Sequence, residues 1–99
     1  MWILRSVTDV DGRTWLFRLP WGATRVIGRA PGADFIIEAP LVSRLHCRLG
    51  ATSPDRLEVI DLDSTNGTFV NDKRIFKGTA SHGDTLRVGR VELTVSQEH

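Results

Sequence analysis

Apolar residues recur along the chain in short bursts with a period close to two, and turn-forming residues interrupt these bursts every several positions. This pattern is typical of β-strands that bury one face, because successive side chains of a strand point to opposite sides. We expect no helix. The segments predicted as strands are residues 2–7, 14–19, 24–27, 35–37, 46–49, 57–61, 68–70, 73–75, 85–88 and 91–95. Short strands at such close spacing predict a β-sandwich or a β-barrel.

Dipeptides that favour tight turns separate several of these segments. Asp11-Gly12 predicts a hairpin turn between the first two strands, Asn71-Asp72 predicts another, and Gly89-Arg90 precedes the last strand. We find no internal repeat, low-complexity segment or linker, which indicates one compact module.

The overall composition narrows the class of protein. At 99 residues the chain has the length of a single domain with one hydrophobic core. Apolar residues at 40% and charged residues at 25% are ordinary globular values and argue against disorder. A net charge of +1 does not favour bulk nucleic-acid binding. No apolar run reaches the roughly 18 residues of a transmembrane helix, and the first residues lack the pattern of a signal peptide.

Cys47 is the single cysteine, so an internal disulfide is excluded, which fits a reducing compartment. We therefore expect an intracellular location, cytoplasmic or, in a eukaryote, nuclear. Cys47 itself is expected to be a buried small hydrophobe. Trp2, Trp15 and Phe17 are expected in or beside the core, and Trp21, which lies in a loop, on the surface.

Candidate chemistry concentrates in three fragments, residues 27–29, 42–47 and 62–71. The third contains Asp, Ser, Thr, Asn and Gly in succession between two predicted strands, which indicates a tight polar loop on a rigid frame. Together the fragments offer one arginine, one serine hydroxyl, one threonine hydroxyl and one asparagine amide. This set suits an oxyanion attached to a peptide.

The order and spacing of Gly28-Arg29, Ser43-x-x-His46 and Thr65-Asn66-Gly67 resemble those of a forkhead-associated (FHA) domain, and residues 32–37 and 83–89 match as well. The resemblance covers the chain from Trp2 to Val95. It implies a single FHA domain over residues 1–99, with a core of about residues 2–95. The implied fold is an all-β sandwich of eleven short, mostly antiparallel strands with ligand loops at one end. The implied function is non-catalytic binding of a phosphothreonine-containing protein or peptide, without a cofactor or a metal ion.

The resemblance assigns a role to each residue of the motifs. Ser43 matches the motif serine and would donate its hydroxyl to the phosphate. Arg44 occupies a position that often makes a second phosphate or backbone contact, although a solvated side chain is the alternative. His46 is structural and bridges the loops from behind, so that Ser43 and Arg44 point outward. Gly28 and Gly67 are needed for the shape of the backbone.

The chemistry of phosphothreonine supports the remaining assignments. Arg29 would supply a planar fork of donors, because a single point charge could not bind two phosphate oxygens in one geometry. Thr65 would add a hydroxyl, or serve only to form the turn. Asn66 would hold the peptide backbone through its amide, the alternative being an asparagine at positive φ. A surface ion pair is the alternative for Arg29.

Two positions depart from the family pattern. Ala39 stands where many relatives have aspartate, and Leu41 stands where some relatives read a ligand side chain after the phosphothreonine. Leu41 would favour an apolar ligand residue or give little selection. Neither departure touches the phosphate-binding set.

Other classes of function compete with this interpretation. One is a phosphate-independent protein–protein interaction domain on the same fold, which would not need the intact set of anion-binding residues. Ser43 and His46 are residue types that form the active sites of serine hydrolases. However, the sequence shows no recognisable acid that would orient the histidine and no nucleophile-elbow motif. The histidines and Cys47 lack the spacing of a zinc motif. A nucleic-acid surface would need a basic stripe interleaved with aromatic residues, which the sequence does not indicate.

Overall fold

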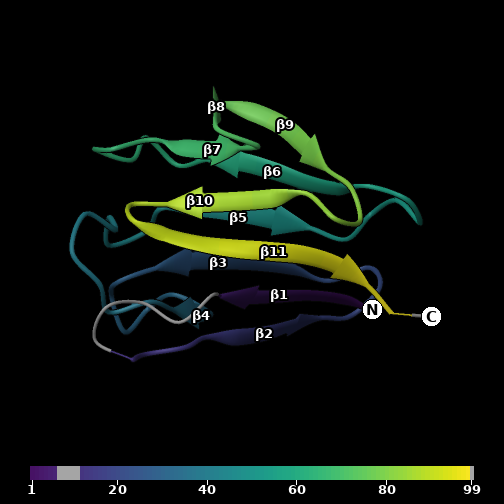
Figure 1. Ribbon diagram of the computed structural model, residues 1–99, viewed down its shortest axis with the longest axis horizontal. Helices are drawn as coiled ribbons and strands as arrows, with labels where there is room; N and C mark the ends of the chain where they lie inside the picture. The colour runs from purple at the N-terminus through teal and green to yellow at the C-terminus, as the bar shows by residue number, and fades with distance from the viewer. Residues whose placement is uncertain (7–11, 99) are drawn as a thin grey trace.

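The computed structural model describes residues 1–6 and 12–98. Within these residues the chain forms eleven β-strands and no helix (Figure 1). In chain order the strands are β1 (Trp2–Ser6), β2 (Leu16–Leu19), β3 (Thr24–Gly28), β4 (Phe35–Ile36), β5 (Cys47–Gly50), β6 (Leu57–Asp61), β7 (Thr68–Val70), β8 (Lys73–Ile75), β9 (Lys77–Ala80), β10 (Thr85–Val88) and β11 (Val91–Gln97). None of these residues belongs to a helix that could cross a membrane.

The strands form two sheets that pack face to face. One sheet has six strands in the order β2-β1-β11-β10-β7-β8, and the other has five in the order β4-β3-β5-β6-β9. The pairing of β3 with β4 is parallel, and the other pairs are antiparallel. The all-β sandwich of about eleven short, mostly antiparallel strands that the sequence predicts is confirmed.

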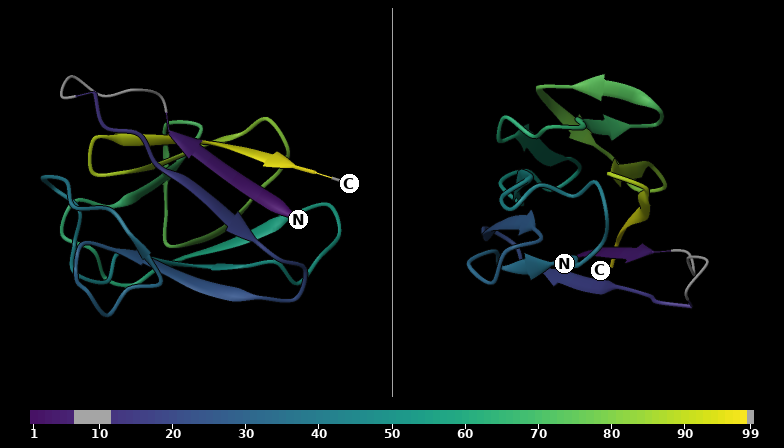
Figure 2. Two further views of the ribbon diagram at one scale, coloured as in Figure 1. Left: turned by 90° about the horizontal axis from the view of Figure 1, so that it is seen from below. Right: turned by 90° about the vertical axis from the view of Figure 1, so that its left-hand side faces the viewer.

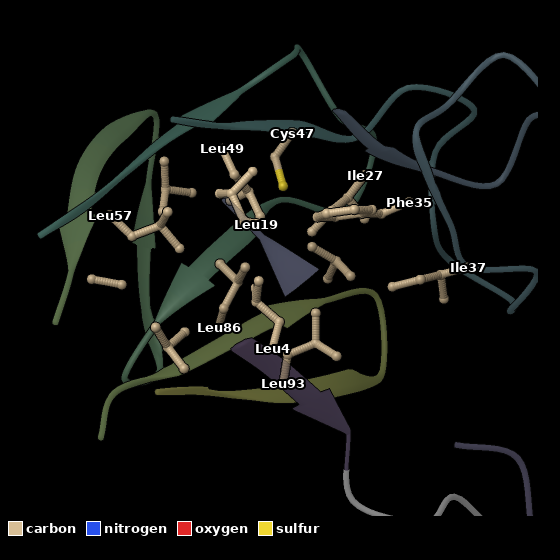
Figure 3. Packing of buried hydrophobic residues seen from close by; sticks show 14 of the residues in the cluster. Leu4, Leu19, Ile27, Phe35, Ile37, Cys47, Leu49, Leu57, Leu86 and Leu93 are labelled. Atoms are coloured by element: carbon tan, nitrogen blue, oxygen red, sulfur yellow. The ribbon is translucent and has the colours of Figure 1, made fainter. Parts of the chain in front are cut away.

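The hydrophobic core fills the space between the two sheets (Figure 3). Leu4, Leu86 and Leu93 project from the six-stranded sheet, and Leu49 and Leu57 project from the five-stranded sheet; each is fully buried. Truncating such a leucine to alanine typically costs about 2–5 kcal/mol of stability. Because this core fixes the strands relative to one another, it also fixes the positions at which the loops begin and end.

Two aromatic rings tie the edges of the sheets together on one side of the sandwich. Phe17 of β2 and Phe35 of β4 stack with ring centroids 4.6 Å apart and an interplanar angle of 11°. Because β2 and β4 are edge strands of different sheets, this contact closes one side of the core.

The aromatic residues and the cysteine lie where the sequence predicts. Trp2 and Cys47 are buried, and Trp15 and Phe17 are partly buried against the core. Trp21 is 61% exposed.

Each predicted strand forms, with ends that differ by up to two residues, but one strand was not predicted and one is less buried than expected. β9 is not predicted, because Gly78 and Ala80 are depleted in strands; it forms because it pairs with β6 and buries Ala80 in the core. The segment 35–37 is predicted as a buried strand, but β4 ends at Ile36, which is 37% exposed on a sheet edge. Val7 and Asp11, which the predictions place in the first strand and its hairpin turn, lie outside the described residues.

The loops that carry the candidate chemistry gather at one end of the sandwich. Segments 29–34, 37–46, 62–67 and the turn between β10 and β11 lie together at the left of Figure 1, and the two termini lie at the opposite end (Figure 2). Reciprocal backbone hydrogen bonds between Met1 and Glu98 hold the terminal segments side by side.

Cys47 provides a simple test of the core. Burial raises the pKa of its thiol to about 12, and the nearby Asp61 carboxylate acts in the same direction. Because the thiolate is the reactive form, we expect no detectable reaction with a thiol reagent at pH 8 in the native protein and complete reaction after unfolding in denaturant. Fast modification of the folded protein would show that Cys47 is accessible to solvent and would contradict its burial in the core.

Candidate functional site

The five residues predicted to contact a ligand line one open pocket of about 400 Å³ at the loop end of the sandwich. The lining consists of Arg29, Leu41, Val42, Ser43, Arg44, Thr65 and Asn66. Three separate loops contribute these residues, and the lining holds two guanidinium groups and no carboxylate. The pocket is therefore suited to an anion.

Arg29 follows β3 directly and is fixed by the neighbouring loop. Its backbone N–H donates to the Ser43 carbonyl at 3.0 Å, and its side-chain Nε donates to the Val42 carbonyl at 3.1 Å. No hydrogen bond to another described residue engages its terminal Nη groups. The guanidinium is thus oriented through Nε while its fork of terminal donors remains available.

Ser43 connects two loops. Its Oγ accepts a hydrogen bond from the Thr65 backbone N–H at 3.0 Å, which leaves the hydroxyl hydrogen of Ser43 to donate elsewhere. The Thr65 side chain is exposed at the same pocket. Both hydroxyls can therefore donate to one group in the pocket.

Asn66 crosses from the third loop to the second. Its Nδ2 donates to the Leu41 carbonyl at 3.1 Å, and Leu41 has a φ of 71°, in the region that non-glycine residues seldom adopt. The interpretation of Asn66 as a positive-φ turn residue is wrong, because φ is positive at Asp63 and Gly67 but not at Asn66. The amide oxygen of Asn66 stays available for a ligand.

Arg44 contributes its backbone to the fold and its side chain to the surface. Its carbonyl oxygen accepts from the Ala30 N–H at 3.1 Å, whereas the exposed guanidinium lines the pocket without a hydrogen bond to any described residue.

His46 is fully buried behind the pocket and links the loops that form it. Its Nδ1 accepts from the Ser43 backbone N–H at 3.0 Å, and its Nε2 lies 2.8 Å from the Gly67 carbonyl. This pattern requires the neutral tautomer with hydrogen on Nε2, because Nδ1 cannot donate to an N–H group. Burial lowers the pKa of His46 below its ordinary value of 6.5, although the hydrogen bond to Gly67 and the Asp61 charge oppose this effect.

Asp61 anchors the third loop, although the sequence pattern assigned it only to a strand. Its carboxylate accepts from the Ser64 hydroxyl at 2.6 Å, the Ser64 N–H at 3.1 Å and the Thr68 hydroxyl at 2.7 Å. Ser64 Oγ in turn accepts from the Gly67 N–H at 3.0 Å. Burial alone would raise the pKa of Asp61, but these hydrogen bonds outweigh it and the pKa is lowered. An Asp followed three residues later by Ser is the signal that could have indicated this loop anchor.

Gly28 and Gly67 are both required by their surroundings. A Cβ at Gly28 would lie 2.1 Å from the Arg44 carbonyl oxygen, because the second loop passes directly over β3. Gly67 has a φ of +90°, which permits the third loop to turn into β7.

The family model, the curated relatives and the solved structures that resemble this chain point to the same family. The family model described as FHA domain matches residues 25–89. Among curated relatives, FhaA of Mycobacterium tuberculosis, an FHA domain-containing protein, is 34% identical over 90 residues, which cover 91% of this chain and 16% of that protein. The ABC transporter ATP-binding/permease protein Rv1747 of the same organism is 43% identical over 75 residues, which cover 76% of this chain and 8% of that protein. The chain thus spans a small part of the length of both relatives.

Solved structures agree with this assignment. The FhaA FHA domain, crystallised in complex with the intracellular domain of Rv3910, is 32% identical, has a TM-score of 0.77, and the match covers 96% of this chain and 99% of that one. A structure from a study of phosphothreonine-dependent FHA domain interactions is 31% identical, with a TM-score of 0.79 and coverage of 99% and 97%.

Gly28 offers a sharp test of the loop packing. We expect Gly28→Ala to displace the Arg44 backbone, because the new methyl group overlaps its carbonyl oxygen, and to lower stability by about 1–3 kcal/mol. Gly32→Ala is the matched control, since nothing lies within 4 Å of a Cβ there and its φ is not positive. Urea unfolding of both variants measures the difference. Equal stability of the two variants would contradict the close approach.

His46 makes the stability depend on pH in a defined window. Its pKa is lowered on folding, so below about pH 6.5 the unfolded chain binds the additional proton; the contribution of His46 to stability is constant above this pH and falls below it. The contribution of Asp61 to stability is fully present above its ordinary pKa of 3.8. It is lost only as the pH falls through the lower pKa that Asp61 has in the folded protein. We expect urea unfolding to show a decrease in stability between pH 7 and pH 5.

The variant His46→Ala separates this contribution from the others. At pH 7.5 it should lose about 2–4 kcal/mol, because the Ser43 N–H and the Gly67 carbonyl are left without partners. The decrease between pH 7 and pH 5 should become smaller in the variant than in the wild type. Equal stability at pH 7.5, or an unchanged slope, would contradict the bridging role of a neutral imidazole.

Proposed function

The chain belongs to the FHA domain family, and from this premise we propose that it is a non-catalytic module that binds phosphothreonine in partner proteins. The observation that carries the proposal is the anion-suited pocket lined by Arg29, Ser43, Thr65 and Asn66. The solved relative whose study describes phosphothreonine-dependent interactions supports it.

The donors of the pocket suit the charge of a phosphothreonine. The phosphate carries about −1.5 to −2 charges at pH 7 and offers three acceptor oxygens. We propose that the Nη groups of Arg29 bind two of these oxygens in parallel, and that the hydroxyls of Ser43 and Thr65 bind the remaining positions. Arg44 adds a second positive charge at the rim.

Asn66 has a different proposed role. Its Nδ2 is already bound to the Leu41 carbonyl, so its free amide oxygen is suited to accept a backbone N–H of the ligand. The apolar lining next to these donors comes from Leu41 and Val42. A threonine γ-methyl group packed there would discriminate against phosphoserine by roughly 1–3 kcal/mol.

The loops hold these donors in place before a ligand arrives. Ser43 and Thr65 are joined by a hydrogen bond, and His46 lies behind both loops. Because the backbone needs no further ordering, little binding free energy is lost to conformational entropy.

The same geometry argues against a hydrolase. His46 Nδ1 accepts a hydrogen bond from the Ser43 backbone N–H, so this nitrogen is not placed to accept the proton of the Ser43 hydroxyl. The hydroxyl oxygen accepts from Thr65 instead, and a nucleophilic serine needs a base that takes its proton. We infer that Ser43 binds rather than reacts.

We further propose that residues 2–95 act as one domain inside the cell. A single buried thiol, Cys47, fits a reducing compartment. The proposal concerns this domain and does not extend to the other parts of its longer relatives.

Arg29 tests the function directly. We expect calorimetry to detect binding of a phosphothreonine peptide, weaker binding of the matched phosphoserine peptide and no binding of the unphosphorylated peptide. Arg29→Ala should weaken phosphothreonine binding at least about 100-fold, because charge-assisted hydrogen bonds contribute about 1.5–3 kcal/mol each. Arg56→Ala, at an exposed arginine outside the pocket, is the matched control.

Two outcomes would overturn the proposal. Retained affinity in a folded Arg29→Ala variant would reject the proposed phosphate contact. Equal binding of the unphosphorylated and phosphorylated peptides would favour the phosphate-independent interaction domain.

A further inference from the structure

Four side chains form an alternating ladder of arginine and phenylalanine on the outer face of the six-stranded sheet. The Arg87 guanidinium lies over the Phe69 ring, 4.0 Å from its centroid, and Phe69 is paired across the strands with Arg74. The Arg74 guanidinium lies 5.5 Å from the centroid of Phe76. We call these residues the Arg–Phe ladder. It runs across β10, β7 and β8 and ends at the residue after β8.

The ladder faces solvent. Thr68 and Val70 on either side of Phe69 are buried, so Phe69 points to the outer face. Phe76 is 71% exposed. The rings and the stacked guanidiniums thus form a surface patch rather than part of the core.

The two guanidiniums have unused donors at their edges. A guanidinium that stacks on a ring keeps its N–H groups in its own plane, pointing away from the ring. Arg87 donates only to the Gly89 carbonyl at 3.3 Å, and Arg74 makes no hydrogen bond or ion pair with a described residue. Glu92 is the cross-strand neighbour of Arg87, but it forms no ion pair with Arg87. Neither guanidinium therefore has a counter-charge among residues 1–6 and 12–98.

Both arginines adjoin loops that frame the phosphate pocket. Arg74 Nε would lie 2.9 Å from a Cβ placed on Gly67, the residue after Asn66. Arg87 is bonded to Gly89, and a Cβ on Gly89 would lie 3.0 Å from the carbonyl carbon of Leu41, which lines the pocket. The ladder therefore adjoins the pocket at two places, at Gly67 through Arg74 and at Leu41 through Arg87 and Gly89.

We propose that the Arg–Phe ladder binds an acidic stretch of the same polypeptide that places its phosphothreonine in the pocket. This inference rests on the proposed function. An extended chain advances about 3.3 Å per residue, so residues a few positions from the phosphothreonine extend beyond the pocket onto the surface that adjoins it, where the ladder lies. The Arg87 guanidinium is held by the Phe69 ring and the Gly89 carbonyl before binding, which reduces the entropy lost when it pairs with a carboxylate.

An acidic polypeptide explains the ladder better than a nucleic acid. Stacking of successive bases needs several open aromatic faces, whereas Phe69 is half-buried under the Arg87 guanidinium and Phe76 is the one largely exposed ring of the ladder. A single-stranded nucleic acid also needs a groove that tracks many phosphates, whereas the ladder offers two cations beside a pocket for one phosphate.

The test compares two phosphothreonine peptides by calorimetry at physiological salt. One has alanine and serine at the flanking positions, and the other has aspartate and glutamate there. We expect the wild-type domain to bind the acidic-flanked peptide about three- to tenfold more tightly, as exposed ion pairs are individually weak. In the double variant Arg74→Gln/Arg87→Gln this preference should disappear while the affinity for the neutral-flanked peptide is unchanged. The double variant Arg18→Gln/Arg56→Gln, at two exposed arginines outside the ladder and the pocket, removes the same charge and should keep the preference.

The outcomes separate this inference from the proposed function. Equal affinity of the wild type for the two peptides overturns the ladder proposal and leaves phosphothreonine binding intact. Weaker binding of the neutral-flanked peptide by the double variant shows that the arginines support the loop instead, which also overturns it. Loss of the preference in Arg18→Gln/Arg56→Gln would assign the preference to overall charge and overturn the proposal. Tighter binding of a single-stranded oligonucleotide that depends on Arg74 and Arg87 would assign the surface to nucleic acid, which also overturns it. Absence of binding to either phosphothreonine peptide overturns the proposed function itself.

Discussion

A neutral, buried imidazole is the constraint on which the binding end of this domain depends. His46 accepts a hydrogen bond from one loop and donates one to another, so a single side chain fixes the distance between Ser43 and Gly67. Desolvation of the ring is unfavourable for its charged form, and this keeps Nδ1 free to accept. Asp61 fixes the far side of the third loop through Ser64 and Thr68. Two polar side chains at the edge of the core thereby define the shape of a surface pocket.

This arrangement explains why strained backbone is tolerated in the same region. Leu41 and Asp63 both adopt positive φ, which is unfavourable for residues with a side chain and persists only where the surroundings determine the conformation. The Leu41 carbonyl is held by Asn66, and its backbone packs against the turn at Gly89. The loops are rigid because each is bound to the next, and the rigidity is what a site for one phosphate requires.

The sequence predicted the fold well and the site in part, and the difference has a physical origin. Period-two patterning located ten of the strands because their burial alternates locally, whereas β9 depends on pairing with β6 and on the burial of Ala80. The residues that line the pocket were accessible through a family resemblance. Asp61 was not, because its importance arises from three hydrogen bonds that only the folded loop creates. The Arg–Phe ladder was also missed: its members are dispersed along the chain, and the register of β10, β7 and β8 brings them together.

The distribution of charge matters more here than the total. A net charge of +1 gives no indication of an anion site, yet the pocket lining holds two arginines and no carboxylate.

We infer above all that this pocket is formed before the ligand arrives and receives a phosphate without rearrangement. A titration of ¹⁵N-labelled protein with a neutral-flanked phosphothreonine peptide, followed by NMR of the backbone amides and of the His46 ring, tests this claim most directly. We expect shifts confined to the loops around Arg29, Ser43 and Thr65, with His46 protonated on Nε2 before and after binding. A change of the His46 tautomer, or shifts centred on the opposite end of the sandwich, would contradict it.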